Sequence, residues 1–284
     1  MPYALSERSE SRGATAVDHA LSERSESKGR DYLESLLRDR KLDHTVWGLT
    51  PVLVRGSDPI TALAPGADAR WLVPTGIAEL DARLDGGIPR GHLSEVVGPR
   101  SSGRLAILMS ALARATLRGE LVALIDPLDM FDPVSASVSG VDFQRMVWIR
   151  GEATSSARVS LSCEYGTLQK SLDRAVKALN IVLQAGGFGL VVLDLAEVAP
   201  QTIKRLPYTT WLRLHRVIEG SETACVLIGS EPITRSSGGV SVQLNGPKAK
   251  SRKPEAGYID ARVVRSRARE TDHHVRVPLS AAAC

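Results

Sequence analysis

The sequence predicts an α/β fold in which helices flank a mostly parallel, twisted β-sheet. Short apolar runs alternate with longer helical patterns, and this alternation is typical of parallel sheets. Several of the runs are apolar throughout, as expected for strands buried on both faces. We expect strands at 93–97, 121–125, 147–149, 190–195 and 224–228.

Helical periodicity fills three of the intervals between these runs. It predicts helices over 105–117, 168–184 and 203–218. Pro207 should start or kink the third, because proline lacks the amide that a helix interior requires. Residues 259–277 contain two β-like stretches around 270–272. These predict a C-terminal β-hairpin that extends the same sheet.

Composition excludes several classes of protein. Apolar residues make up 43% and charged residues 24% of the 284, which are ordinary globular values and exclude a fibrous or wholly disordered chain. No apolar run approaches the roughly 18 residues that a membrane span needs, and the first 30 residues lack the order of a secretory signal. We therefore expect a cytoplasmic protein without membrane contact. The three cysteines have no metal-ligand spacing, so no metal is expected.

The chain divides into four expected parts. Residues 1–30 contain the octapeptide ALSERSES twice and predict a disordered leader, and residues 31–70 predict an amphipathic helix and a linker. Residues 71–244 form the expected core. Residues 245–284 form a basic linker and β extension with nine Lys/Arg against four acids, which suggests a polyanion or an acidic partner.

The amphipathic helix near the N-terminus is a candidate docking element. Its apolar side chains fall near helical spacing. They could dock on the core of the same chain or on a partner, and the pattern leaves both open. The candidate docking residues are Tyr32, Leu33, Leu36 and Leu37.

A glycine-rich loop lies between the first expected core strand and the helix after it. Residues 98–105 read GPRSSGRL and follow the phosphate-loop pattern GxxxxGK[ST] except at its last two positions. Arg104 replaces the lysine with a bulkier planar cation, and Leu105 offers no oxygen to a magnesium ion. The nucleotide-site remnant then comprises Gly98, Ser101, Ser102, Gly103, Arg104 and Asp194, the last at the end of a strand.

These segments resemble the RecA/RadA class of recombinase ATPases. VPTGIAELDARLDGGIPRGHLSEVVGPRSSGRL, from 73 to 105, follows the entry motif of that class, and the resemblance extends to about residue 269. It implies a RecA-like P-loop core. IDPLDMFDP, residues 125–133, resembles the class motif IDAEHALDP, whose glutamate is the general base, and Leu128 stands at that position.

The resemblance implies that catalytic roles are missing at Arg104, Leu105 and Leu128. Phosphoryl transfer depends on positioning and charge neutralisation, so we expect no useful ATP hydrolysis and no enzymatic function. Asp129 is a weak substitute base, because a shift of one residue turns its side chain to another face. ATP binding without hydrolysis stays open, since the glycines and the helix terminus persist.

Within this class the chain most resembles the ImuA family. Residues 89–104 carry the form P-R-G-x-L-[ST]-E-[VL]-x-G-P-R-x-S-G-R, and a helix precedes the core. The family implies a role in damage-induced SOS mutagenesis and translesion DNA synthesis, with an ImuB-like polymerase-related protein, RecA and an alternative replicative polymerase catalytic subunit as partners. Two alternatives are a DNA-dependent ATPase of the RecA/RadA type and a SulA-like cell-division inhibitor.

Single-stranded DNA is a further candidate partner. The RecA class binds it through two loops, of which the second could persist at 231–243 with Arg235, or be merely a flexible loop. Arg265, Arg267 and Arg269 recur at period two and would form a basic stripe on one strand. The stripe could contact DNA or an acidic partner, or simply protect a sheet edge.

Overall fold

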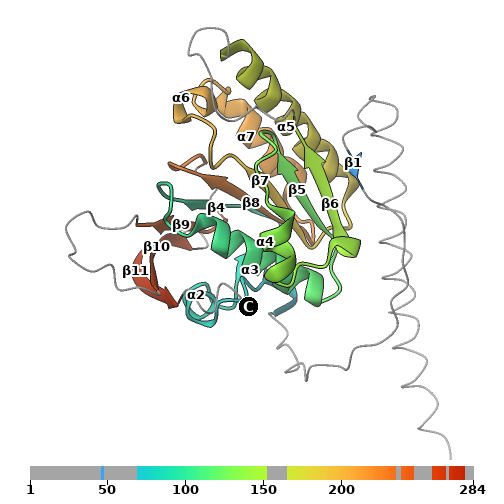
Figure 1. Ribbon diagram of the computed structural model, residues 1–284. Coiled ribbons are helices and arrows are strands. Elements are labelled where there is room, and N and C mark those ends of the chain that lie inside the picture. The colour runs from blue at the N-terminus through green and yellow to red at the C-terminus, as the bar shows by residue number, and fades with distance from the viewer. Residues whose placement is uncertain are drawn as a thin grey trace, which may run out of the picture.

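A computed structural model describes residues 46–47, 69–151, 165–234, 238–245, 258–266 and 269–278. Within them, nine strands form one sheet in the order β1-β6-β5-β7-β8-β4-β9-β10-β11 (Figure 1). A second, two-stranded sheet pairs β2 (Leu72–Val73) with β3 (Ile88–Pro89). The strands of the large sheet are β1 (Val46–Trp47), β4 (Leu93–Val97), β5 (Val122–Asp126), β6 (Met146–Arg150), β7 (Leu190–Asp194), β8 (Ala224–Gly229), β9 (Ser241–Leu244), β10 (Tyr258–Ser266) and β11 (Arg269–Pro278).

The centre of the large sheet is parallel. β4 pairs in parallel with β8 and β9, β7 pairs in parallel with β5 and β8, and β5 pairs in parallel with β6. The antiparallel pairs lie at the two ends, where β1 joins β6 and where β10 joins β9 and β11. The predicted α/β fold with a mostly parallel sheet and a C-terminal hairpin is therefore confirmed.

Helices cover both faces of this sheet (Figure 1). Successive residues of a strand point to opposite faces. On β5, Val122 and Leu124 pack in the cluster beneath one helical layer, whereas Ala123 and Ile125 pack in the cluster beneath the other. The first layer contains α2 (Ala78–Arg83), α3 (Arg104–Leu117) and α4 (Pro133–Val138), and the second contains α5 (Tyr165–Ala185), α6 (Pro200–Ile203) and α7 (Tyr208–Ile218).

Two predicted elements differ in detail. The helix expected over 203–218 consists of α6 and α7, with Pro207 as the residue before α7. The hairpin pairs Ser266 with Arg269, so residues 270–272 belong to β11 and do not lie between the strands. Polar residues normally mark turns, but here no glycine, asparagine or proline marks the tip, and the pattern alone could not place it.

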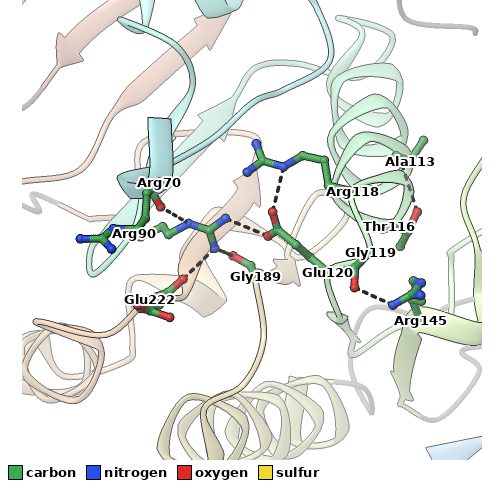
Figure 2. Close-up of polar contacts among 10 residues, drawn as sticks. All are labelled: Arg70, Arg90, Ala113, Thr116, Arg118, Gly119, Glu120, Arg145, Gly189 and Glu222. Carbon is green, nitrogen blue, oxygen red and sulfur yellow. Dashed lines mark hydrogen bonds and ion pairs between the residues drawn. The ribbon is translucent and has the colours of Figure 1, made fainter. Parts of the chain in front are cut away.

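Arg90 forms hydrogen bonds and an ion pair at the amino-terminal ends of the parallel strands. Its guanidinium donates to the backbone carbonyls of Arg70, Gly189 and Glu222, and pairs with the Glu120 carboxylate at 2.8 Å (Figure 2). Gly189 directly precedes β7, Glu120 and Glu222 lie two residues before β5 and β8, and Arg90 itself lies three residues before β4. One nearly buried side chain thus joins the entry points of four strands, at the edge opposite the glycine-rich loop.

Candidate functional site

The glycine-rich loop connects the end of β4 to the start of α3. Gly103 has φ +94° and Ser101 has φ +59°, both in the left-handed region that favours glycine. A Cβ on Gly98 would lie 2.7 Å from the Leu244 carbonyl oxygen, and one on Gly103 would overlap the Ile259 side chain. Both glycines are therefore required by the packing of β9 and β10 against the loop.

Arg104 is buried and points across the loop toward β7. Its Nη1 donates to the Ala196 carbonyl at 3.1 Å, and its Nη2 lies 3.4 Å from Glu197 Oε1. The other carboxylate oxygen of Glu197 lies 3.2 Å from Arg100 Nε. Burial lowers the pKa of Arg104, while the charge of Glu197 opposes that shift. The Glu197 carboxylate is thus an internal counter-ion shared by two arginines of the loop.

Asp194 ends β7 beside this ion pair. Its carboxylate accepts a 2.9 Å hydrogen bond from the Ala196 amide. Burial, opposed by the hydrogen bond from Ala196 and by the charge of Arg104 and aided by the neighbouring Asp126 carboxylate, raises the pKa of Asp194 to about 6. The structure therefore brings Arg104 and Asp194 together, as the sequence predicts for the two halves of a nucleotide site.

Leu105 and Leu128 stand at two positions where the resemblance implies catalytic groups. Leu105 is 47% exposed on the first turn of α3 and carries no ligand atom. Leu128 is buried and packs in the cluster beneath the second helical layer. Neither side chain can accept a proton or bind a metal ion.

The nearby aspartates are held by structural contacts. Asp126 accepts hydrogen bonds from the amides of Met130 and Phe131. Asp129 forms a two-pronged ion pair with Arg150, at 2.6 and 2.8 Å, and Arg150 in turn stacks over the Trp148 ring. The carboxylate of Asp129 therefore neutralises Arg150, which makes it a poor candidate for a general base.

The two serines of the loop differ in environment. Ser101 is exposed. Ser102 is 4% exposed, and its hydroxyl finds no hydrogen-bond partner among the described residues. Because Ser102 Oγ lies where a Cβ on Gly98 would meet it at 2.7 Å, the hydroxyl turns back toward the start of the loop.

Glu95 is a site residue that sequence reasoning missed. It is 2% exposed on β4, and its carboxylate accepts hydrogen bonds from the amides of Ile233 and Thr234 and from the Ser241 hydroxyl. These bonds connect β4 to two amides that follow β8 and to the first residue of β9. The available signal was a glutamate inside an otherwise buried strand, since buried carboxylates need partners.

Several predicted contact residues lie outside the described residues: Tyr32, Leu33, Leu36, Leu37, Arg235 and Arg267. Arg265 belongs to β10 and Arg269 to β11, and the two strands are antiparallel. The expectation of three arginines along one strand is therefore wrong, because the chain reverses between Ser266 and Arg269. Period two in the sequence implies a shared face only within a single strand.

Metal and membrane sites were also sought in the described part of the chain. No cluster of three or more His, Cys, Asp or Glu side chains suited to a metal ion occurs there. No helix within it has the length and apolar character to cross a membrane.

Comparison with known proteins finds similarity to RecA. The RecA N-terminal domain family matches residues 60–157, which include the loop and β4 to β6. Protein RecA of Chlorobaculum tepidum is 30% identical over 132 residues, covering 46% of this chain and 33% of that protein. Protein RecA of Acholeplasma laidlawii is 32% identical over 149 residues (51% and 40%), and that of Frankia alni 26% over 172 residues (59% and 43%). The chain thus spans well under half the length of these relatives.

Proposed function

From the premise that this chain has a RecA-like fold and that its matches support the RecA/RadA superfamily, we propose that it is a non-hydrolysing accessory protein of DNA repair. In this proposal the chain is of the ImuA type and acts as an adaptor or regulator of a translesion polymerase assembly in damage-induced mutagenesis.

The observation that carries the proposal is the pairing of Arg104 with Glu197. In a working phosphate loop the cation at this position reaches the β- and γ-phosphates. Here the guanidinium is buried and hydrogen-bonded to the segment after β7, and the Glu197 carboxylate lies beside it. One carboxylate of the same chain thus offsets part of the positive charge of the loop, which favours a structural role over turnover.

The second support is the loss of acid–base and metal groups around the loop. Leu128 packs in the core, Leu105 faces solvent, and Asp129 is paired with Arg150. Removal of a metal ligand and a general base together costs several powers of ten in phosphoryl transfer. A scaffold that keeps its fold without these groups is suited to binding partners.

The partners in this proposal are an ImuB-like polymerase-related protein, RecA and an alternative replicative polymerase catalytic subunit. They are what the resemblance of residues 89–104 to the ImuA family implies. Residues Tyr32, Leu33, Leu36 and Leu37 are the proposed docking element, and the proposed location is the cytoplasm. Replacing Leu33 and Leu36 with serine in the full chain should weaken capture of an ImuB-like polymerase-related protein.

The decisive experiment measures phosphate release from magnesium-ATP with and without single-stranded DNA. We expect the full chain to release no more phosphate than its Asp194→Ala variant, because neither has a working site. A RecA preparation serves as the positive control. Turnover by the full chain that Asp194→Ala abolishes would favour the alternative, a DNA-dependent ATPase, and would refute the proposal.

A further inference from the structure

The two helical layers differ strongly in charge. Helices α5, α6 and α7 carry five cations against one acid, Asp173. Helices α2, α3 and α4 carry three cations against two acids, and one of those cations is Arg104, already paired with Glu197. The excess positive charge of the described helices therefore lies on the α5–α7 side of the sheet.

Four of these cations form what we call the basic face: Lys170, Lys177, Arg213 and Arg216. Lys170 and Lys177 are seven residues apart on α5, and Arg213 and Arg216 are three apart on α7, so each pair lies on one side of its helix. All four side chains are exposed. α5 and α7 pack against each other on the same side of the sheet, so both pairs belong to one helical layer (Figure 1).

The basic face carries little counter-charge, because Asp173, three residues after Lys170 and four before Lys177 on the same side of α5, is the one acidic residue of α5, α6 and α7. Within the described ranges, no ion pair joins any of its four cations to a carboxylate, although other arginines of the fold are paired. The nearby Asp173 accepts from the Gln169 amide instead. Neighbouring like charges repel, so a negatively charged ligand from outside the chain would relieve that repulsion.

We infer that the basic face binds the phosphate backbone of nucleic acid without reading its sequence. Successive phosphates along a strand offer a regular series of charges to a row of exposed cations. Lys170 and Lys177 make up half of the face, and protein–protein interfaces are depleted in lysine, whereas nucleic-acid interfaces are strongly positive. Tyr208, the first residue of the same helix as Arg213 and Arg216, is 60% exposed and is an aromatic residue on which a base could stack.

This surface is distinct from the contacts predicted from the sequence. The loop at 231–243 and the arginines of β10 and β11 belong to other elements, and the phosphate loop opens from the far end of β4. The inference also does not depend on the adaptor role, because it follows from exposed charge on α5 and α7. A result that refutes nucleic-acid binding therefore does not refute the adaptor role, and the reverse also holds.

The test compares two double variants of the full chain that change net charge equally. Lys177→Glu with Arg216→Glu reverses charge on the basic face, and Arg83→Glu with Arg114→Glu reverses two exposed arginines of the opposite layer. Fluorescence anisotropy follows binding of a labelled thymidine oligonucleotide and of a mixed-sequence duplex over a range of salt. Thermal unfolding followed by circular dichroism checks that the variants fold. Lys177→Gln with Arg216→Gln removes the same two charges without reversing them.

We expect the basic-face variant to bind at least about tenfold more weakly, with the slope of log affinity against log salt reduced by about two, while the opposite-layer variant binds like the unaltered chain. Equal losses in both variants, or no binding by the unaltered chain, would overturn the inference. So would binding of polyglutamate, but of neither nucleic acid, that the basic-face changes abolish, because this result identifies an acidic polypeptide as the partner.

Discussion

Arg104 and Glu197 join the first turn of α3 to the segment that follows β7. The 3.4 Å approach between Nη2 and Oε1 is reinforced by the bond from Nη1 to the Ala196 carbonyl, so two points on the β7 side hold the guanidinium. Arg100 contacts the same carboxylate from the exposed side of the loop. These contacts tie the loop after β4 to the segment after β7, although β8 lies between the two strands in the sheet.

Neutralising Glu197 should make the loop a better anion site. Glu197→Gln removes the negative charge shared by Arg100 and Arg104, so we expect fluorescent ATP analogues to bind at least about tenfold more tightly than to the unaltered chain. The measurement is a titration at low salt. Glu222→Gln, an exposed glutamate at the opposite edge, is the matched control and should change nothing. Equal affinity in the unaltered chain and Glu197→Gln would contradict the internal counter-ion.

Because of Asp194, the free energy of unfolding should fall as the pH rises from about 4 to about 6. Its pKa is raised to about 6 in the fold from 3.8, so its protonated form is favoured in the folded state. The stabilisation is therefore complete below the unfolded pKa and is lost as pH rises through the folded pKa, by about 3 kcal/mol at most. Asp194→Asn should remove this loss while keeping an oxygen for the Ala196 amide. Urea unfolding at several pH values measures it, and an unchanged pH profile in Asp194→Asn would contradict the prediction.

Loss of the Arg90 side chain should destabilise the whole sheet. Arg90→Ala removes a donor from three backbone carbonyls and from Glu120, of which Gly189 keeps the Ala224 amide and Glu120 keeps Arg118, and we expect a loss of about 2 kcal/mol in the free energy of unfolding. Arg114→Ala, at an exposed position of α3, should cost less than about 0.5 kcal/mol. Urea denaturation compares the two. Similar small losses in both would show that the Arg90 contacts contribute little.

Gly103 should be required because of Ile259 as well as its backbone angle. Gly103→Ala places a Cβ at φ +94° against the Ile259 side chain, and we expect a cost of at least about 2 kcal/mol. In an Ile259→Ala background the same change should cost less, because the overlap is relieved. A double-mutant cycle from unfolding curves gives this coupling. Strictly additive effects would assign the whole cost to the backbone.

The fold was largely predictable because its signals are local. Short, mostly apolar runs marked β4 to β8, and helical periodicity marked α3 and α5 to within a few residues. The glycine loop could be located by its motif. The tip of the β10–β11 hairpin could not, because no residue with turn preference occupies it, and so the arginines of that region were assigned to one strand.

The connections of the site were much less predictable. The partner of Arg104 is 93 residues away in the chain, and Glu95 meets amides at 233 and 234. Such bonds depend on which strands become neighbours and on where each side chain points, and neither can be derived from spacing. Asp194 was found only because the end of a strand is itself a position that a sequence pattern can mark.

The position of Arg90 has a consequence for how this scaffold tolerates change. The guanidinium network that anchors the sheet sits where the strands begin, and the glycine segment sits where β4 ends. Substitutions at one border therefore leave the anchoring at the other untouched. A molecule arranged in this way can exchange its ligand chemistry and keep its architecture.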